Sequence, residues 1–204
     1  MNPGDQTPEP DRSGVWFFVA CVFEGGLILV AWVIAAFAGV PLFGDFHWDA
    51  LDALKGVAAT VPPLLFFVWS MNATWDPVRR VRVALEEFAR PIFRDFSILQ
   101  LLIVSIVAGV SEEVLFRAVI QGGLEEPAGR IAALAMASLL FGLVHAVTLG
   151  YAVGATVIGV YIGWIWMQGG NLLIPIVIHA AYDFVALTWF VRKTPPLEMD
   201  SEKK

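Results

Sequence analysis

Long runs of apolar residues decide what this chain can fold into. Apolar residues make up 58% of the 204 positions and charged residues only 16%, a composition outside that of soluble domains. Six runs come close to the roughly 20 apolar residues with which a helix crosses a bilayer. They cover residues 15–40, 56–71, 96–122, 130–146, 151–167 and 172–191. Because backbone groups in lipid must hydrogen-bond within their own segment, we expect an all-α fold, a polytopic transmembrane helix bundle of about six spans.

A single membrane-embedded domain is expected between two polar tails. The N-terminal tail covers residues 1–14, the domain 15–191 with a motif-bearing core at 96–191, and the C-terminal tail 192–204. Pro62-Pro63 predicts a kink or an irregular start in the second span. Polar connections are expected at 41–55 and, as a short acidic turn, at 124–129.

Charge outside the apolar runs indicates the orientation. Residues 72–95 hold five arginines interleaved with valine, leucine and phenylalanine, a pattern typical of an amphipathic basic helix on a membrane surface. With both termini inside, ten of the thirteen Lys and Arg residues fall on the cytoplasmic side, as the positive-inside rule requires. We therefore expect a multi-pass membrane protein with both termini in the cytoplasm. The net charge of −6 and the lack of a Lys/Arg-rich run argue against a nucleic-acid partner.

Three ionisable residues interrupt the third apolar run. Glu112, Glu113 and Arg117 lie within it, although a charge in the hydrocarbon costs roughly 2.5 to 3.5 kcal/mol and usually faces a partner or a cavity. Glu113 and Arg117 are i, i+4 neighbours that can neutralise each other. Glu112 lies about 100° around the helix from Glu113 and therefore needs another partner. Glu24, alone in the first run, is expected to be structural or to line a cavity.

Histidines in two other runs supply candidate partners. Phe141 and His145 share one helix face, and so do His179 and Asp183. Three spans thus offer polar groups to one interior, which favours a shared site over three separate interhelical bridges. A carboxylate shielded from water is suited to act as a general base, and imidazoles can orient a water or donate to an oxyanion. The predicted span limits put His145 about two turns nearer the cytoplasm than Glu112, a gap that a tilt or a later start of the fourth helix would close.

The three motifs resemble those of the CAAX-protease and bacteriocin-processing (CPBP, or Abi) family of intramembrane endopeptidases. They are Glu112-Glu113-x-x-x-Arg117, Phe141-x-x-x-His145 and His179-x-x-x-Asp183. The resemblance implies an intramembrane endopeptidase in which Glu112 activates water, His145 positions that water, and His179 with Asp183 stabilises the oxyanion or contacts water. Members that process eukaryotic CAAX proteins have asparagine at the last position. Since an ionised carboxylate cannot donate, we expect Asp183 to orient His179.

The resemblance also bears on cofactor, substrate and location. Family members were long described as metalloproteases, and Glu112, His145 and His179 would be the zinc ligands, but no H-E-x-x-H is present and we expect a metal-independent mechanism without a cofactor. The substrate would be a peptide or a membrane protein, prenylated or not, in a prokaryotic inner or plasma membrane. The alternatives are a scaffold or bacteriocin-immunity protein that binds a partner helix through the same polar interior, and, less favoured, a proton-coupled transporter.

Overall fold

The computed structural model describes residues 12–193, and the regular structure in this range is helical. Most of the predicted polar tails, 1–14 and 192–204, lies outside the described residues. Five helical segments are long and apolar enough to cross a membrane. They are Ser13–Ala38, Ala50–Asn72, Ile98–Ala128, Leu149–Gly169 and Leu173–Arg192. The predicted all-α polytopic bundle is confirmed. The fourth expected span is shorter than the others, a 15-residue apolar helix over Arg130–Val144.

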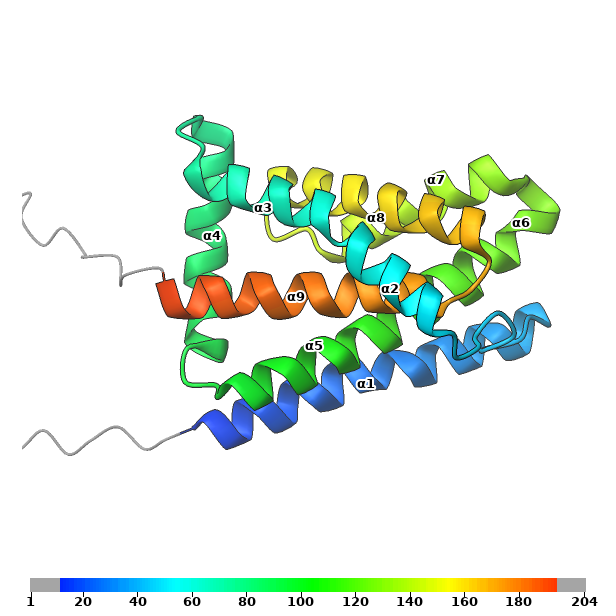
Figure 1. Cartoon of the computed structure of the whole chain (residues 1–204), viewed down its shortest axis with the longest axis horizontal. Helices are drawn as coiled ribbons and strands as arrows, with labels where there is room; N and C mark the ends of the chain where they lie inside the picture. Colours follow the sequence, from blue (N-terminus) through cyan, green and yellow to red (C-terminus); the bar gives the residue numbers. More distant parts are fainter. Residues whose placement is uncertain (1–11, 194–204) are drawn as a thin grey trace, which may run out of the picture.

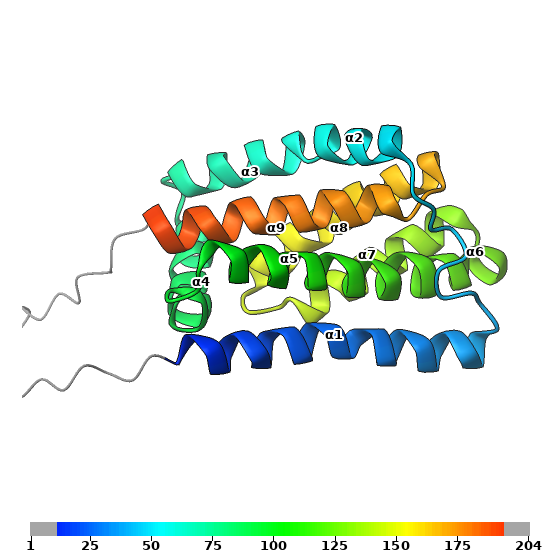
Figure 2. The same ribbon diagram turned by 60° about the horizontal axis from the view of Figure 1, so that its bottom comes forward.

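The bundle is built around two long helices. Helix α5 (Ile98–Glu113) packs against α9 (Leu173–Lys193), with α1 (Ser13–Ala38) on the other side of α5. Figure 2 shows α1, α5 and α9 running side by side. Gly109 permits the close approach of α5 to α9, because a Cβ there would lie 2.9 Å from the backbone nitrogen of Ala180.

The second span is broken, as the Pro62-Pro63 pair predicts. Helix α2 (Ala50–Ala59) is followed by Thr60, and α3 (Val61–Asn72) has both prolines in its first turn. A missing backbone N–H costs nothing in the first turn of a helix. The expected polar connection 41–55 is too long, however. Helix α2 already begins at Ala50, because the Asp49 side chain caps it by accepting from the backbone N–H of Asp52 at 2.8 Å.

The amphipathic basic helix is present as α4 (Asp76–Phe93). It runs across the ends of α1, α5 and α9 (Figure 1). Helix α4 contacts α1, α3, α8 and α9. Such a position, at the rim of a membrane-spanning bundle, is the one that an amphipathic helix on a membrane surface takes.

The third span is longer than predicted and changes its helix type. Helix α5 continues into a π-helix, η1 (Val114–Gln121), and then into α6 (Gly122–Ala128). The predicted acidic turn at 124–129 is therefore wrong: Glu125 and Glu126 are helical, and the chain turns at Gly129, where φ is +83°. π-Helices are rare and occur mostly at functional sites, and this one follows directly on Glu112 and Glu113.

Helices α7 and α8 form a close pair beside the central helices. Helix α7 (Arg130–Val144) packs against α8 (Leu149–Gly169). Glycines allow this contact, since a Cβ on Gly159 would lie 3.4 Å from Ser138, and one on Gly142 would overlap the Thr156 side chain. Gly163 also packs closely, because a Cβ there would meet Leu134 at 2.6 Å.

Candidate active site

All three sequence motifs meet in the interior of the bundle. The glutamates lie at the end of α5, Arg117 in η1, Phe141 in α7 and His145 directly after it, and His179 with Asp183 in α9. Ion-pair, hydrogen-bond and ring contacts connect the seven side chains. We call this set the Glu-His cluster.

Glu113 lies at the most buried end of the cluster. Its Oε2 lies 2.9 Å from Nε of Arg117, and both side chains are completely buried. Its Oε1 lies 2.7 Å from Nδ1 of His179. The predicted pairing of Glu113 with Arg117 is confirmed. Because a carboxylate oxygen only accepts, Nδ1 of His179 is the donor in this contact. A single buried carboxylate thus fixes both a guanidinium and an imidazole.

Glu112 faces the other histidine. Its Oε2 lies 3.5 Å from Nε2 of His145, while Nδ1 of His145 lies 2.8 Å from the carbonyl oxygen of Phe141. A carbonyl only accepts, so Nδ1 of His145 carries the hydrogen, and in the neutral ring Nε2 is an acceptor. Glu112 and His145 therefore present two acceptors to the same place.

His179 stands between two carboxylates. Its Nε2 lies 3.4 Å from Oδ2 of Asp183, on the side opposite to Glu113. The geometry agrees with the expectation that Asp183 orients His179. The Phe141 ring packs against this part of the cluster, with its centroid 4.4 Å from that of His145 and 6.0 Å from that of His179, and with the Arg117 guanidinium carbon 5.3 Å above it.

Exposure distinguishes the two sides of the cluster. The side chains of Glu113 and Arg117 are 0% exposed and that of Glu112 is 8% exposed, whereas His145 is 26% and Asp183 28% exposed. A ligand would therefore approach the cluster from the side of His145 and Asp183.

The longer third helix removes the expected gap between Glu112 and His145. Glu112 lies 14 residues, about 21 Å, from the start of the helical segment Ile98–Ala128. Helix α7 returns over 15 residues, about 22 Å, and brings Nε2 of His145 to 3.5 Å from Oε2 of Glu112. The predicted end of the third span at residue 122 leaves out six residues of this segment. Six residues are nearly two helical turns, which is the predicted difference in depth between Glu112 and His145.

Further side chains near the cluster do not belong to the three motifs. Glu24 of α1 lies within hydrogen-bonding reach of the Glu112 side chain and within electrostatic reach of His179 and Asp183. The Tyr151 ring of α8 lies 6.3 Å from the His145 ring. The sequence signal for Glu24 is a carboxylate in an apolar run, which predicts a structural or cavity-lining role but not its partner, and Tyr151 gives none.

The donors do not converge on a metal position. Within residues 12–193, no group of three or more His, Cys, Asp or Glu side chains is placed to hold a metal ion. Both ring nitrogens of His179 face carboxylates at 2.7 and 3.4 Å, and Nδ1 of His145 is bonded to a carbonyl. Of the three residues that the resemblance suggested as zinc ligands, His179 has no ring nitrogen free for a metal ion in this arrangement.

Fold and cluster together define a multi-pass helical membrane protein with a buried group of glutamates and histidines. Residues 94–185 match the family model described as type II CAAX prenyl endopeptidase Rce1-like. The match supports the predicted family for the motif-bearing part of the chain, which is similar to CAAX prenyl endopeptidases over residues 94–185. Neither the search of curated proteins nor the search of solved structures gave a match. Helices α1 to α4 lie outside the matched residues.

Proposed function

We propose that this protein is a glutamate-dependent intramembrane endopeptidase. The observation that carries the proposal is the pair of acceptors, Oε2 of Glu112 and Nε2 of His145, 3.5 Å apart on the more open side of the cluster. A water molecule that donates one hydrogen to each acceptor keeps a lone pair free to attack a carbonyl carbon. Such an arrangement favours water activation by general-base catalysis.

The hydrolysis then needs one proton carrier and one oxyanion donor. As the water oxygen bonds to the carbonyl carbon, one water proton passes to the Glu112 carboxylate. When the carbon–nitrogen bond breaks, this proton passes to the leaving amine, so that Glu112 serves first as base and then as acid. His179, held between Glu113 and Asp183, supplies a donor at Nε2 when its ring is doubly protonated, and this hydrogen stabilises the oxyanion. No step in this scheme requires a metal ion.

The roles of the residues follow from this geometry, and the substrate class follows from the family description. We assign catalytic contact with water or substrate to Glu112, His145 and His179, orientation of His179 to Asp183, and support to Glu113, Arg117 and Phe141. The family description names prenyl endopeptidases, so the substrate we propose is a peptide segment or a membrane protein, prenylated or not. The segment would reach the cluster beside His145 and Asp183. We also propose that both termini and α4 lie on the cytoplasmic side.

The experiment that tests the proposal needs no known substrate. Membranes from cells that express the wild type or Glu112→Gln at equal levels are compared for new protein N-termini. We expect a set of N-termini that occurs with the wild type only, because the isosteric amide keeps the shape of Glu112 and removes the base. His47→Gln is a matched control, since the His47 side chain is 65% exposed and lies outside the cluster. Identical N-termini for wild type and Glu112→Gln, with a candidate substrate co-expressed, would refute the proposal.

A further inference from the structure

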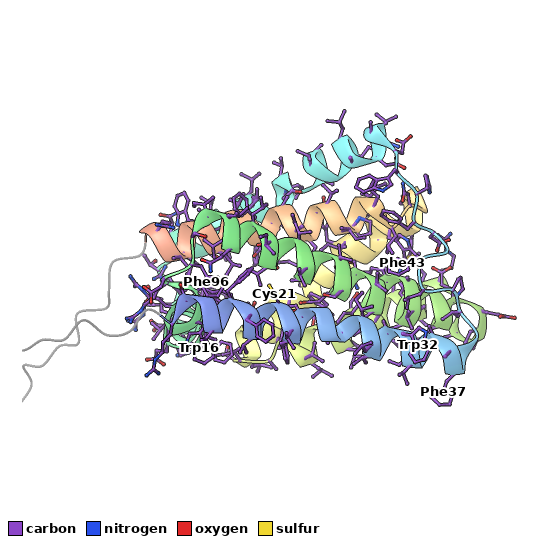
Figure 3. All side chains as sticks on the ribbon, turned by 90° about the horizontal axis from the view of Figure 1, so that it is seen from below. Trp16, Cys21, Trp32, Phe37, Phe43 and Phe96 are labelled. Carbon is purple, nitrogen blue, oxygen red and sulfur yellow. The ribbon has the colours of Figure 1, made fainter. Side chains whose placement is uncertain are left out.

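Helix α1 brings an additional carboxyl group to the Glu-His cluster. Glu24 lies near the middle of α1, and its Oε2 is buried without a hydrogen-bond donor from the described residues. Figure 3 looks onto α1 and labels Cys21, which lies one helical turn before Glu24. Ionisable groups at this depth are costly and are usually functional. Because α1 lies outside residues 94–185, the family match says nothing about this residue.

The partner of Glu24 is the proposed base. The Glu24 side chain lies within hydrogen-bonding reach of that of Glu112. Glu112 is 6% exposed as a residue, and its Oε2 also has no hydrogen-bond donor within residues 12–193. The contact joins α1 to α5, two helices that pack along each other. Two carboxyl groups from different helices therefore meet where the water would be activated.

A hydrogen bond between two carboxyl groups needs a proton. Ionised carboxylates only accept, so at least one partner must carry hydrogen. The neighbouring charges also favour a proton on this pair. Asp183 is another nearby carboxylate. The cation Arg117 is paired with Glu113, and His179 lies between Glu113 and Asp183. Two adjacent carboxylates without a cation of their own share one proton rather than ionise together.

We propose that Glu24 and Glu112 hold a single proton between them, and that Glu24 is thereby a positioning residue for the base. The catalytic part of this inference rests on the proposed function. At rest the pair carries one proton and one negative charge. When water attacks, the second proton neutralises the pair. One proton then leaves with the amine, and the pair returns to its resting state. Glu24 fixes the orientation of Glu112 throughout.

Infrared spectroscopy of the purified protein tests the shared proton without a substrate. A protonated carboxyl group gives a C=O stretching band that moves in D2O. We expect Glu24→Gln and Glu112→Gln each to lose the intensity of one such group, and the double variant to lose no more than either single one. Glu126→Gln, on the exposed side of α6, is the matched control and should keep the band. An intact band in Glu24→Gln, or losses that add in the double variant, would overturn the shared proton.

Kinetics separate the positioning role from a purely structural one. With a substrate identified from the N-termini, we expect Glu24→Gln to lower kcat about tenfold at an unchanged KM, a part of the typical contribution of general-base catalysis. Glu24→Asp, which keeps a carboxyl group, should recover part of the rate. A wild-type kcat in Glu24→Gln would refute the positioning role. Since the spectra need no turnover, failure of the protease proposal and failure of the shared proton give different results.

Discussion

Replacement of Arg117 by methionine is a direct test of how the cluster tolerates buried charge. The substitution removes the guanidinium whose Nε lies 2.9 Å from Glu113, and it leaves that carboxylate completely buried with His179 as its remaining polar partner. Loss of one member of a buried ion pair costs about 3 to 5 kcal/mol. The contact of the guanidinium with the Phe141 ring adds about 0.5 to 2 kcal/mol within the same change.

Such a loss is large beside the total stability of a folded domain, about 5 to 15 kcal/mol. Titration of the protein with a denaturing detergent in mixed micelles, followed by circular dichroism, measures it. Arg79→Met is the matched control, because Arg79 pairs with Asp76 at 3.4 Å with both side chains more than 60% exposed. For this exposed pair we expect a loss of at most about 1 kcal/mol.

A double variant identifies the cause of the loss. Glu113→Gln keeps an acceptor for Nδ1 of His179 and removes the charge that Arg117→Met leaves unpaired. The double variant should therefore be more stable than Arg117→Met alone, a non-additivity typical of residues in contact. Equal stability losses for Arg117→Met and Arg79→Met would refute the reasoning, and so would a double variant whose loss equals the sum of the single losses.

Two further experiments test the contribution of Asn171 to stability and the metal independence of the proposed cleavage. Asn171→Ala should lower stability by about 2 to 4 kcal/mol with turnover of the folded protein unchanged, because the buried Asn171 amide bonds to Asp52 at 2.9 Å and to the backbone of His47 and Leu173. The exposed Asn72→Ala, which loses one bond to a carbonyl, is its control in the same detergent titration. A metal chelator should leave the rate of cleavage of an identified substrate unchanged, and a loss of activity that added zinc restores would contradict the metal-independent mechanism.

Much of the fold followed from hydropathy, and its errors have local causes. The predicted end of the third span, at residue 122, is too early because Glu125 and Glu126 favour a turn by composition but are helical. The helix ends at Gly129, where φ is +83°. A glycine after a helix is the stronger signal for its end. The early start of α2 also had a signal, since Asp49 followed by Asp52 resembles a capping pair.

The candidate site was partly predictable for a different reason. Glu112, Glu113, Arg117, His145 and His179 were found because each is a costly polar group inside an apolar run, and that cost is visible in one sequence. The contacts between them were not. Helical periodicity indicates which residues share a face of one helix, but it does not give the rotation of one helix against another. For Glu24 that rotation decided whether its carboxyl group faced lipid, a neighbouring helix or the base.

The arrangement of charge in the cluster explains how one fold can hold a reactive carboxylate in a membrane. Glu113 lies between the cation Arg117 and the donor His179, and its side chain has no exposure. This ion pair holds the imidazole of His179 in place. Glu112 has no comparable cation within hydrogen-bonding distance and faces the more exposed His145 at 3.5 Å. The consecutive glutamates therefore take different tasks because α5 points one toward the buried arginine and the other toward the open side. In the proposed mechanism Glu112 accepts the proton of the attacking water, and the charge of Glu113 keeps His179 in place.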